Sequence, residues 1–201
     1  MDEIEKTNRT YAQIAAGYAQ ARQRRHMLAR HVARFVELVP PGGLVWDVGC
    51  GPGFDTAVLR QHNLHAFGLD YSRPMITAGR ERLGRQNIFI QADMRRLPLC
   101  SCADGLWVCA SLLHLPRSDA PAALREFYRA LRPGGILYLS VKMGEGEKWV
   151  AGGYGRALPR FFTYWQSDEL DRLITDTAFQ IIDGWTDHTA QTAWLVRFAA
   201  K

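Results

Sequence analysis

Hydrophobic and polar positions along the chain follow two periods, one typical of strands and one typical of helices. Short apolar runs predict buried strands over 44–48, 64–70, 88–91, 106–110 and 136–141. Between these runs, apolar residues recur every three or four positions, which predicts amphipathic helices. These helices are expected over about 22–39, from the loop at 49–53 to about 61, and after the capping candidates Ser72, Ser118 and Ser167. Strands that alternate with helices predict a mostly parallel sheet covered by helices on both faces.

The end of the chain departs from this alternation. Residues 179–185 and 192–199 have the pattern of two strands joined by a short connection. A short connection favours antiparallel pairing. We therefore expect the sheet to finish with an antiparallel hairpin.

Length and composition limit the organisation of the chain. Its 201 residues suffice for one sizeable α/β domain but not for two. We expect a single domain over 1–201, in which helices within 1–39 cap a ligand site and residues 143–166 form a lid-like insertion. The apolar share of 47% is typical of a soluble protein, and no apolar run of about 18 residues predicts a transmembrane helix. The acidic start lacks the features of a secretory signal, so the expected location is the cytoplasm.

The cysteines do not indicate a metal site. Cys50, Cys100, Cys102 and Cys109 form no C-x-x-C pair, and no histidine pair stands at ligand spacing near them. We expect no metal and, in a reducing compartment, no disulfide.

Candidate ligand-binding residues follow three of the predicted strands. Residues 47–53 read Asp-Val-Gly-Cys-Gly-Pro-Gly, and glycines at this place let a ligand approach the backbone closely. Asp70 ends the second strand, where a carboxylate can accept both hydroxyls of a ribose. Asp93 follows the third strand, where it could accept a hydrogen bond from an adenine amino group. Together these positions indicate a nucleotide-like ligand.

A nicotinamide enzyme is a weaker alternative. The three glycines of the loop are followed by Phe54, so the third glycine of the dehydrogenase pattern G-x-G-x-x-G is missing. Asp47 and Asp55 near the loop suit a ligand with ammonium and sulfonium charges better than a diphosphate.

The motifs together resemble the class I S-adenosylmethionine-dependent methyltransferases of the small, single-domain bacterial type. The resemblance rests on the glycine loop, on Gly-Leu-Asp-Tyr-Ser at 68–72, on Ala-Asp-Met at 92–94, on 97–107 and on Leu-Arg-Pro-Gly-Gly at 131–135. It implies a Rossmann-like seven-stranded sheet, mostly parallel with an antiparallel last strand. It also implies S-adenosylmethionine as the cofactor and S-adenosylhomocysteine as its product.

The resemblance also implies roles for individual residues. The positions that would contact the methionine part of the cofactor are Asp47, Gly49, Cys50, Gly51, Gly53, Ala110 and Ser111. Asp70 would hold the ribose, and the positions around the adenine are Tyr71, Met75, Asp93 and Met94. Tyr11 and Tyr18, on one face of an N-terminal helix, match tyrosines that cover the cofactor in related proteins.

The sequence says less about the transfer step. Transfer from a sulfonium is an in-line displacement, to which alignment can contribute on the order of 7–11 kcal/mol. His114, after the fourth strand, is the candidate base, with a pocket-wall role as the alternative. Tyr154 and Arg160 in the 143–166 insertion are candidates for binding the acceptor, and Arg160 could hold an anionic one. The alternative is an insertion that only shields the site.

A small-molecule acceptor is the leading expectation. Residues 110–113 lack the Asn/Asp-Pro-Pro-aromatic motif of enzymes that methylate exocyclic amines of bases, and no Pro-Cys nucleophile follows the fourth strand. The net charge is +5, and no acidic residue stands between Glu5 and Glu37. An RNA or protein methyltransferase that docks through this arginine-rich segment is therefore an alternative. A non-catalytic S-adenosylmethionine-binding protein is another.

Overall fold

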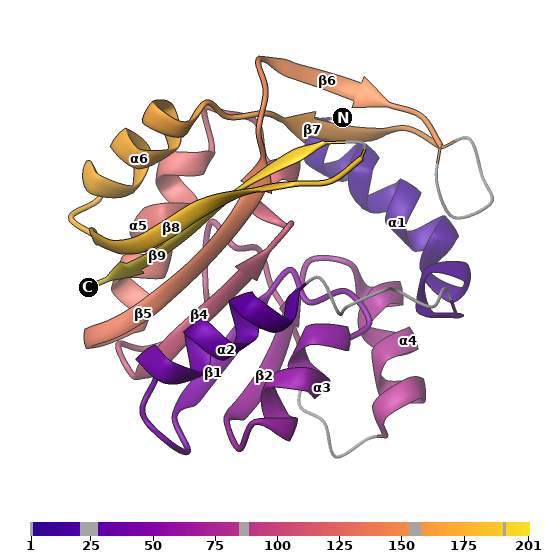
Figure 1. The fold of residues 1–201 in the computed structure, drawn as a ribbon. Coiled ribbons are helices and arrows are strands. Elements are labelled where there is room, and N and C mark those ends of the chain that lie inside the picture. The colour runs from indigo at the N-terminus through magenta and orange to yellow at the C-terminus, as the bar shows by residue number, and fades with distance from the viewer. Residues whose placement is uncertain (1, 21–27, 85–88, 153–157, 191) are drawn as a thin grey trace.

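A computed structural model describes residues 2–20, 28–84, 89–152, 158–190 and 192–201 (Figure 1). The helices are α1 (Glu3–Gln20), α2 (Ala29–Leu38), α3 (Phe54–Gln61), α4 (Arg73–Leu83), the 3₁₀ helix η2 (Leu112–His114), α5 (Ala120–Ala130) and α6 (Ser167–Thr175). The strands are β1 (Leu44–Val48), β2 (His65–Asp70), β3 (Phe89–Gln91), β4 (Ala103–Cys109), β5 (Leu131–Lys142), β6 (Glu147–Val150), β7 (Arg160–Thr163), β8 (Gln180–His188) and β9 (Ala193–Ala200).

Seven of these strands form one sheet in the order β3-β2-β1-β4-β5-β9-β8. The first five strands of the chain run parallel, whereas β9 is antiparallel to both of its neighbours, β5 and β8. The strand order reverses between β1 and β4, which is the place where ligands bind in open α/β sheets. The predicted Rossmann-like sheet with an antiparallel last strand is confirmed.

The two faces of the sheet carry separate cores because successive side chains of a strand point in opposite directions. On one face, Trp107 and Tyr138 stack with ring centroids 3.8 Å apart and pack with Phe35 of α2. On the other face, Leu106 and neighbouring strand residues pack against Phe127 of α5 and other residues of α5 and α6. Helices therefore cover both faces (Figure 1).

Several predicted boundaries were wrong, mainly at helix starts. The N-cap positions of α5 and α6 are Asp119 and Gln166 rather than Ser118 and Ser167. Gln166 forms a capping box with Glu169, in which each side chain bonds to the other residue's backbone. Ser72 does occupy the N-cap position of α4, but its hydroxyl makes no capping bond.

Strand limits also differ from the prediction. β4 begins at Ala103 and β5 at Leu131, because pairing between these two strands extends past the apolar runs that predicted them. The terminal strands are each shifted toward the C-terminus. Residues 22–27 of the helix expected at 22–39, and residue 88 of the third strand, lie outside the described residues.

The 143–166 segment contains a small antiparallel sheet of β6 and β7. This hairpin is tied to α1 by two hydrogen bonds. The backbone N–H of Phe161 donates to Thr7 Oγ1 (3.0 Å), and the Thr10 hydroxyl donates to the carbonyl of Pro159 (2.7 Å). As Figure 1 shows, α1 and β7 thus lie side by side, and α1 also packs on α4.

The described part of the chain lacks both membrane-spanning helices and clusters of metal-ligating side chains. It contains no helix that combines the length and apolar character needed to cross a bilayer. It also contains no group of three or more His, Cys, Asp or Glu side chains arranged to hold a metal ion.

Candidate functional site

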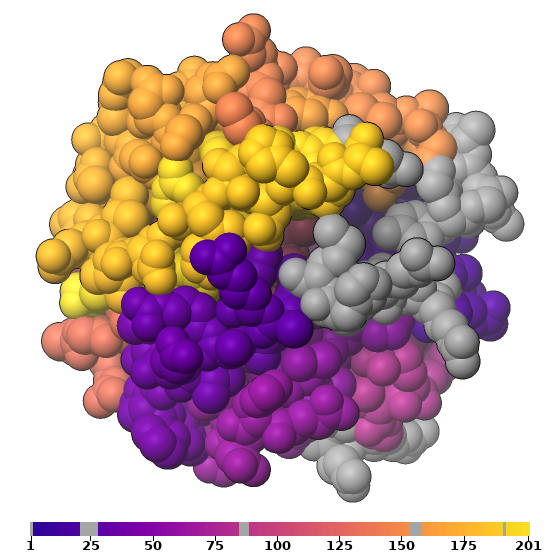
Figure 2. All heavy atoms as spheres, in the orientation of Figure 1, coloured from indigo at the N-terminus to yellow at the C-terminus, as the bar shows by residue number. Residues whose placement is uncertain are grey.

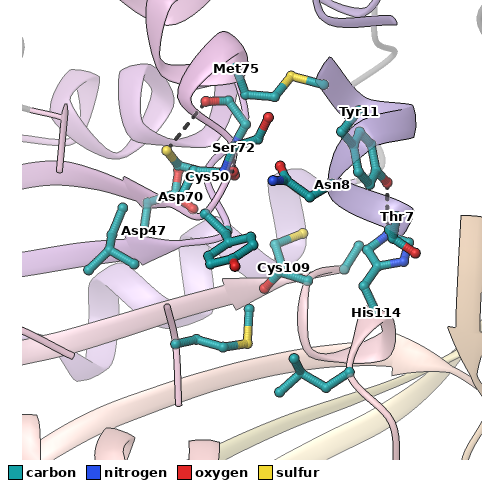
Figure 3. Close-up of a pocket in the computed structure, with 18 of the residues that line it drawn as sticks. Thr7, Asn8, Tyr11, Asp47, Cys50, Asp70, Ser72, Met75, Cys109 and His114 are labelled. Atoms are coloured by element: carbon teal, nitrogen blue, oxygen red, sulfur yellow. Dashed lines mark hydrogen bonds between the residues drawn. The ribbon is translucent and has the colours of Figure 1, made fainter. Parts of the chain in front are cut away.

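A cavity of about 360 Å³ lies at the carboxyl ends of β1 to β4, under α1 (Figure 3). Its size falls within the range of small-ligand sites. It is lined by every cofactor-binding residue predicted from the sequence except Gly53, and by His114. Figure 2 shows a hollow on this face beside the end of the β8–β9 hairpin, where Trp194 of β9 also lines the cavity.

The glycine loop after β1 is held against β2. The backbone N–H groups of Gly49 and Cys50 donate to the carbonyl of Leu69, at 2.7 and 3.1 Å. Gly49 has a φ of +74°, and a Cβ there would lie 2.2 Å from the Cβ of Ser111. The loop therefore requires glycine at position 49 both for its backbone conformation and for its contact with the β4 side of the cavity.

Gly53 serves the fold rather than the cavity wall. It occupies the N-cap position of α3 with a φ of +72°. A Cβ there would lie 2.7 Å from the ring of Phe89. Its glycine is thus required by helix–strand packing.

Asp70 is positioned by the backbone on both sides. Its Oδ2 accepts from the N–H of Gly51 (2.8 Å), and its Oδ1 accepts from the N–H of Ser72 (2.7 Å). Burial raises the pKa of Asp70, although these two hydrogen bonds act to lower it. Each oxygen has a second lone pair, so the carboxylate could accept two hydroxyl groups from the cavity.

Two other carboxylates lie in the wall near the glycine loop. Asp47 is 2% exposed and its Oδ2 accepts from the Thr56 hydroxyl (2.6 Å). Asp55 is also buried, and its Oδ2 accepts from Trp107 Nε1 (3.1 Å). Two carboxylates buried close together make this end of the cavity electronegative, which favours a cationic ligand.

Asp93 lies on the same side of the cavity as Asp70. Burial acts to raise its pKa, but hydrogen bonds and the charge of Arg95 outweigh burial and lower the pKa. The guanidinium of Arg95 contacts both carboxylate oxygens and also reaches Asp119 (2.6 Å). Asp93 is therefore a fixed anion next to the position expected for an adenine.

The sequence did not single out Asn8, which projects from α1 into the cavity (Figure 3). Among the described residues, Asn8 Oδ1 and Ser72 Oγ are buried atoms of the cavity wall without a hydrogen-bond partner. Such atoms indicate a site that a polar ligand completes. The available signal was helical spacing, since Asn8 shares a helix face with Tyr11.

His114 and Tyr11 form the other end of the cavity (Figure 3). His114 Nδ1 lies 2.7 Å from the carbonyl of Phe161, which can only accept, so Nδ1 carries the proton. Nε2 is then an acceptor for the hydroxyl of Tyr11 at 2.8 Å. Burial lowers the pKa of His114 to about 4, and the positive charges of Arg160 and Lys142 act in the same direction. His114 is therefore neutral near pH 7.

The two residues predicted to bind the acceptor are Arg160 and Tyr154. The guanidinium of Arg160 lies 5.9 Å from the ring centroid of Tyr11 and donates to the carbonyl of Gly152 (3.0 Å). It is thus near the cavity but behind the residues that line it. Tyr154 lies outside the described residues.

Comparison with known proteins agrees with this geometry. Residues 46–139 match a family described as a methyltransferase domain, and this stretch runs from β1 through most of β5. This stretch, just under half of the chain, carries all the motifs on which the resemblance to the class I S-adenosylmethionine-dependent methyltransferases rests.

Similar proteins have different acceptors in their names. The chain is 34% identical over 101 residues to malonyl-[acyl-carrier protein] O-methyltransferase from Serratia marcescens, a match that covers 50% of this chain and 38% of that protein. It is 30% identical over 147 residues to tRNA (carboxymethyluridine(34)-5-O)-methyltransferase from Macaca fascicularis, covering 72% of this chain and 21% of that protein. The chain thus spans less than half the length of both relatives.

A solved structure covers the whole fold. It is 1,6-didemethyltoxoflavin-N1-methyltransferase from Burkholderia thailandensis with bound 1,6-didemethyltoxoflavin and S-adenosylhomocysteine. The match has a TM-score of 0.78 at 20% identity and covers 100% of this chain and 91% of that one. At this identity the likeness concerns the fold.

The chemistry of the cavity fits S-adenosylmethionine, the cofactor that the resemblance implies. Carboxylates near the glycine loop suit an ammonium and a sulfonium, and Asp70 has free lone pairs for two ribose hydroxyls. The buried Oδ1 of Asn8 and Oγ of Ser72 offer further polar positions to a ligand of this kind.

Proposed function

We propose that the chain transfers the methyl group of S-adenosylmethionine to a small-molecule acceptor. The observation that carries this proposal is one cavity with two chemically different ends. One end is lined by carboxylates and the glycine loop, and the other by Tyr11 and neutral His114. The acceptor would bind at the end lined by Tyr11 and His114, which we call the acceptor end. The cytoplasmic location expected from the sequence is part of the proposal.

The cofactor-holding residues are proposed as the sequence predicted them. Asp70 would accept from the ribose, while Asp47 and the glycine loop would contact the methionine part. Tyr71 and Met75 would face the adenine from one side, with Asp93 and Met94 on the other. When bound, the cofactor supplies a methyl group already activated on a sulfonium, so the protein chiefly needs to align the nucleophile.

We propose that α1 and the β6–β7 hairpin close the site from water as one unit. The hydroxyl of Tyr71 donates to Glu5 of α1 (2.5 Å), and the hydroxyl of Tyr11 donates to His114 (2.8 Å). Together with the two bonds from α1 to the hairpin, these contacts hold the helix across the cavity. This closure supports the assignment of 1–39 and 143–166 as covering segments of a single domain.

His114 is proposed to position Tyr11 rather than to act as the base. A histidine with a pKa of about 4 is a weak proton acceptor near pH 7. Its protonated Nδ1 and accepting Nε2 instead fix the Tyr11 hydroxyl, whose oxygen keeps a lone pair for the nucleophile of the acceptor.

The contacts of the arginine-rich segment give limited support to docking of RNA or protein. Two arginines of the arginine-rich segment are engaged within the fold. Arg30 stacks 4.0 Å from the ring centroid of Trp185, and Arg34 pairs with Asp183 at 2.7 Å. Arginines engaged in this way contribute less to a docking face, while Arg22, Arg24 and Arg25 lie outside the described residues.

Ligand-induced thermal shifts and a labelled-methyl screen test the proposal. We expect S-adenosylmethionine and S-adenosylhomocysteine to raise the melting temperature and NAD to leave it unchanged. Transfer of labelled methyl groups is expected onto a metabolite pool and not onto RNA. No shift with either sulfur compound would refute cofactor binding, and labelling of RNA alone would favour the RNA methyltransferase.

Removing the His114–Tyr11 hydrogen bond is expected to slow transfer without weakening the cofactor. His114→Ala and Tyr11→Phe should each lower kcat by about ten- to a hundred-fold, less than most losses of a general base. The double variant should be no slower than the worse single variant, because both changes remove the same interaction. Steady-state kinetics and the Kd of S-adenosylhomocysteine measure these effects.

The pH profile separates positioning from base catalysis. Because the pKa of His114 is lowered to about 4, the wild-type rate should show no histidine inflection near neutral pH. An acidic limb with a midpoint near the ordinary histidine value of about 6.5 that disappears in His114→Ala would instead make His114 the base.

A further inference from the structure

Charge is segregated along the cavity. The carboxylates that line it, Asp47, Asp55, Asp70 and Asp93, surround the positions proposed for the cofactor. Around Tyr11 and His114, the described lining residues are uncharged or aromatic and include Leu115 and Trp194. Among the described residues, two cations, Arg160 and Lys142, act on His114 at this end, and both lower its pKa.

Lys142 is the last residue of β5 and is placed toward this end of the cavity. It is paired in register with Trp194 of β9, so the two side chains leave the sheet on the same face. Trp194 lines the cavity, and Lys142 Nζ lies 5.8 Å from the Trp194 ring centroid. Nζ also lies 4.1 Å from the ring centroid of Phe162. The ammonium therefore lies close to Trp194, which lines the cavity, and to Phe162, which packs against His114 from outside the lining.

This ammonium has no anionic partner among the described residues. Its recorded contacts are the two aromatic rings, and no ion pair of the described residues includes it. Lys142 is half-buried, and its pKa is lowered by burial first and then by the charges of Arg160 and Lys148. Burying a cation beside other cations is unfavourable unless an anion compensates it.

Arg160 faces the same aromatic ring from another position. Its guanidinium lies 5.3 Å from the Phe162 centroid, and the Phe162 ring packs 4.8 Å from the ring of His114. Lys142 and Arg160 thus flank the ring of Phe162, which packs against His114 at the proposed acceptor end. An anionic group at this end would interact with both cations.

We propose that the methyl acceptor is a small organic anion whose charged group is bound by Lys142, with Arg160 adding to the positive field. The rings of Tyr11 and Trp194, which line the cavity, would contact its carbon skeleton. This inference rests on the proposed function, because it names the substrate class of the same site. It also explains the charge pattern, since a cationic donor and an anionic acceptor would occupy ends of opposite polarity.

Binding of matched probes to the protein loaded with S-adenosylhomocysteine tests the inference without requiring turnover. The probes are benzoate, phenyl phosphate and the uncharged benzamide, with affinities measured by calorimetry or ligand-observed NMR. We expect at least one of the two anions to bind about ten-fold or more tightly than benzamide, the effect of one charge-assisted hydrogen bond. The stronger of the two anions identifies the charged group as carboxylate or phosphate.

Variants of Lys142 locate the effect. Lys142→Met keeps the aliphatic stem and is expected to abolish the preference for the anion, whereas Lys142→Arg retains most of it. Lys148→Met is the matched control, because Lys148 lies on exposed β6 with its ammonium 4.4 Å from Tyr164, and should bind like the wild type. The Kd of S-adenosylhomocysteine should be the same in all four proteins.

The outcomes separate this inference from the proposed function. Equal binding of the anions and benzamide, no binding of any probe, or an anion preference that survives in Lys142→Met would overturn the inference. Methyl transfer to an uncharged acceptor would then leave the proposed function intact. Lys142-dependent anion binding without methyl transfer to any small molecule would support the anion site and refute the proposed function.

Discussion

Replacing Asp70 by Asn is expected to weaken binding of S-adenosylmethionine by roughly 100- to 1,000-fold, because each hydrogen bond to a charged group contributes about 1.5–3 kcal/mol. The carboxylate is held by the N–H groups of Gly51 and Ser72, and its remaining lone pairs face the cavity. Asn has nearly the same shape but offers one acceptor atom instead of two. Calorimetric titration with S-adenosylmethionine and S-adenosylhomocysteine measures the loss.

The control for this variant is Asp183→Asn. Asp183 of β8 pairs with Arg34 of α2 and does not line the cavity. It should bind the cofactor like the wild type. Unchanged affinity in Asp70→Asn would show that the ribose assignment is wrong.

The same carboxylate predicts how cofactor binding depends on pH. Burial raises the pKa of Asp70, so it takes up its proton at a higher pH than an ordinary aspartate. The ionised form is the one that accepts from two hydroxyls, and affinity should therefore fall as the pH drops through this raised pKa. In Asp70→Asn this part of the acid dependence should disappear.

Replacing Gly49 by Ala is expected to destabilise the protein by about 2–5 kcal/mol and to prevent cofactor binding. The positive φ of +74° costs a non-glycine residue about 1–2 kcal/mol. The added Cβ would meet Ser111 Cβ at 2.2 Å, and relief of such overpacking costs about a further 1–3 kcal/mol. Urea unfolding gives the change in free energy, and titration gives the change in affinity.

Gly134→Ala separates the two contributions. Gly134 has a φ of +75° but no atom within 4 Å of an added Cβ, so this variant should show only the conformational cost. Ser111→Gly in the Gly49→Ala background should recover most of the excess loss. If Gly49→Ala and Gly134→Ala lose the same stability, contact with Ser111 is not what requires glycine at position 49.

Much of the fold could be predicted because it is encoded in short windows. Apolar runs and helical spacing identified the strands and helices of the sheet, and the short terminal connection identified the antiparallel hairpin. Helix starts were less predictable. Whether Ser167 or Gln166 caps α6 depends on which side chain meets a free N–H group, and the reciprocal bonds with Glu169 decided it.

The residues around the proposed acceptor end could not be predicted from short windows of sequence. Lys142, Arg160 and Trp194 are far apart in the chain and carry no motif, and only the pairing of β5 with β9 and the placement of β7 bring them near one ring. Asn8 was missed for a related reason. An isolated asparagine on a helix does not indicate a binding site, and only the folded structure places this helix over a cavity.

The sequence by itself determined the half of the cavity that is proposed to bind the cofactor. The turn after β1 and the aspartate that ends β2 depend on backbone geometry, and a few consecutive residues specify that geometry wherever parallel strands end together. Only the tertiary structure decided the state of His114. Its neutrality and its bond to Tyr11 come from burial and from a contact across 103 positions, because desolvation and long-range proximity arise only when the chain is packed.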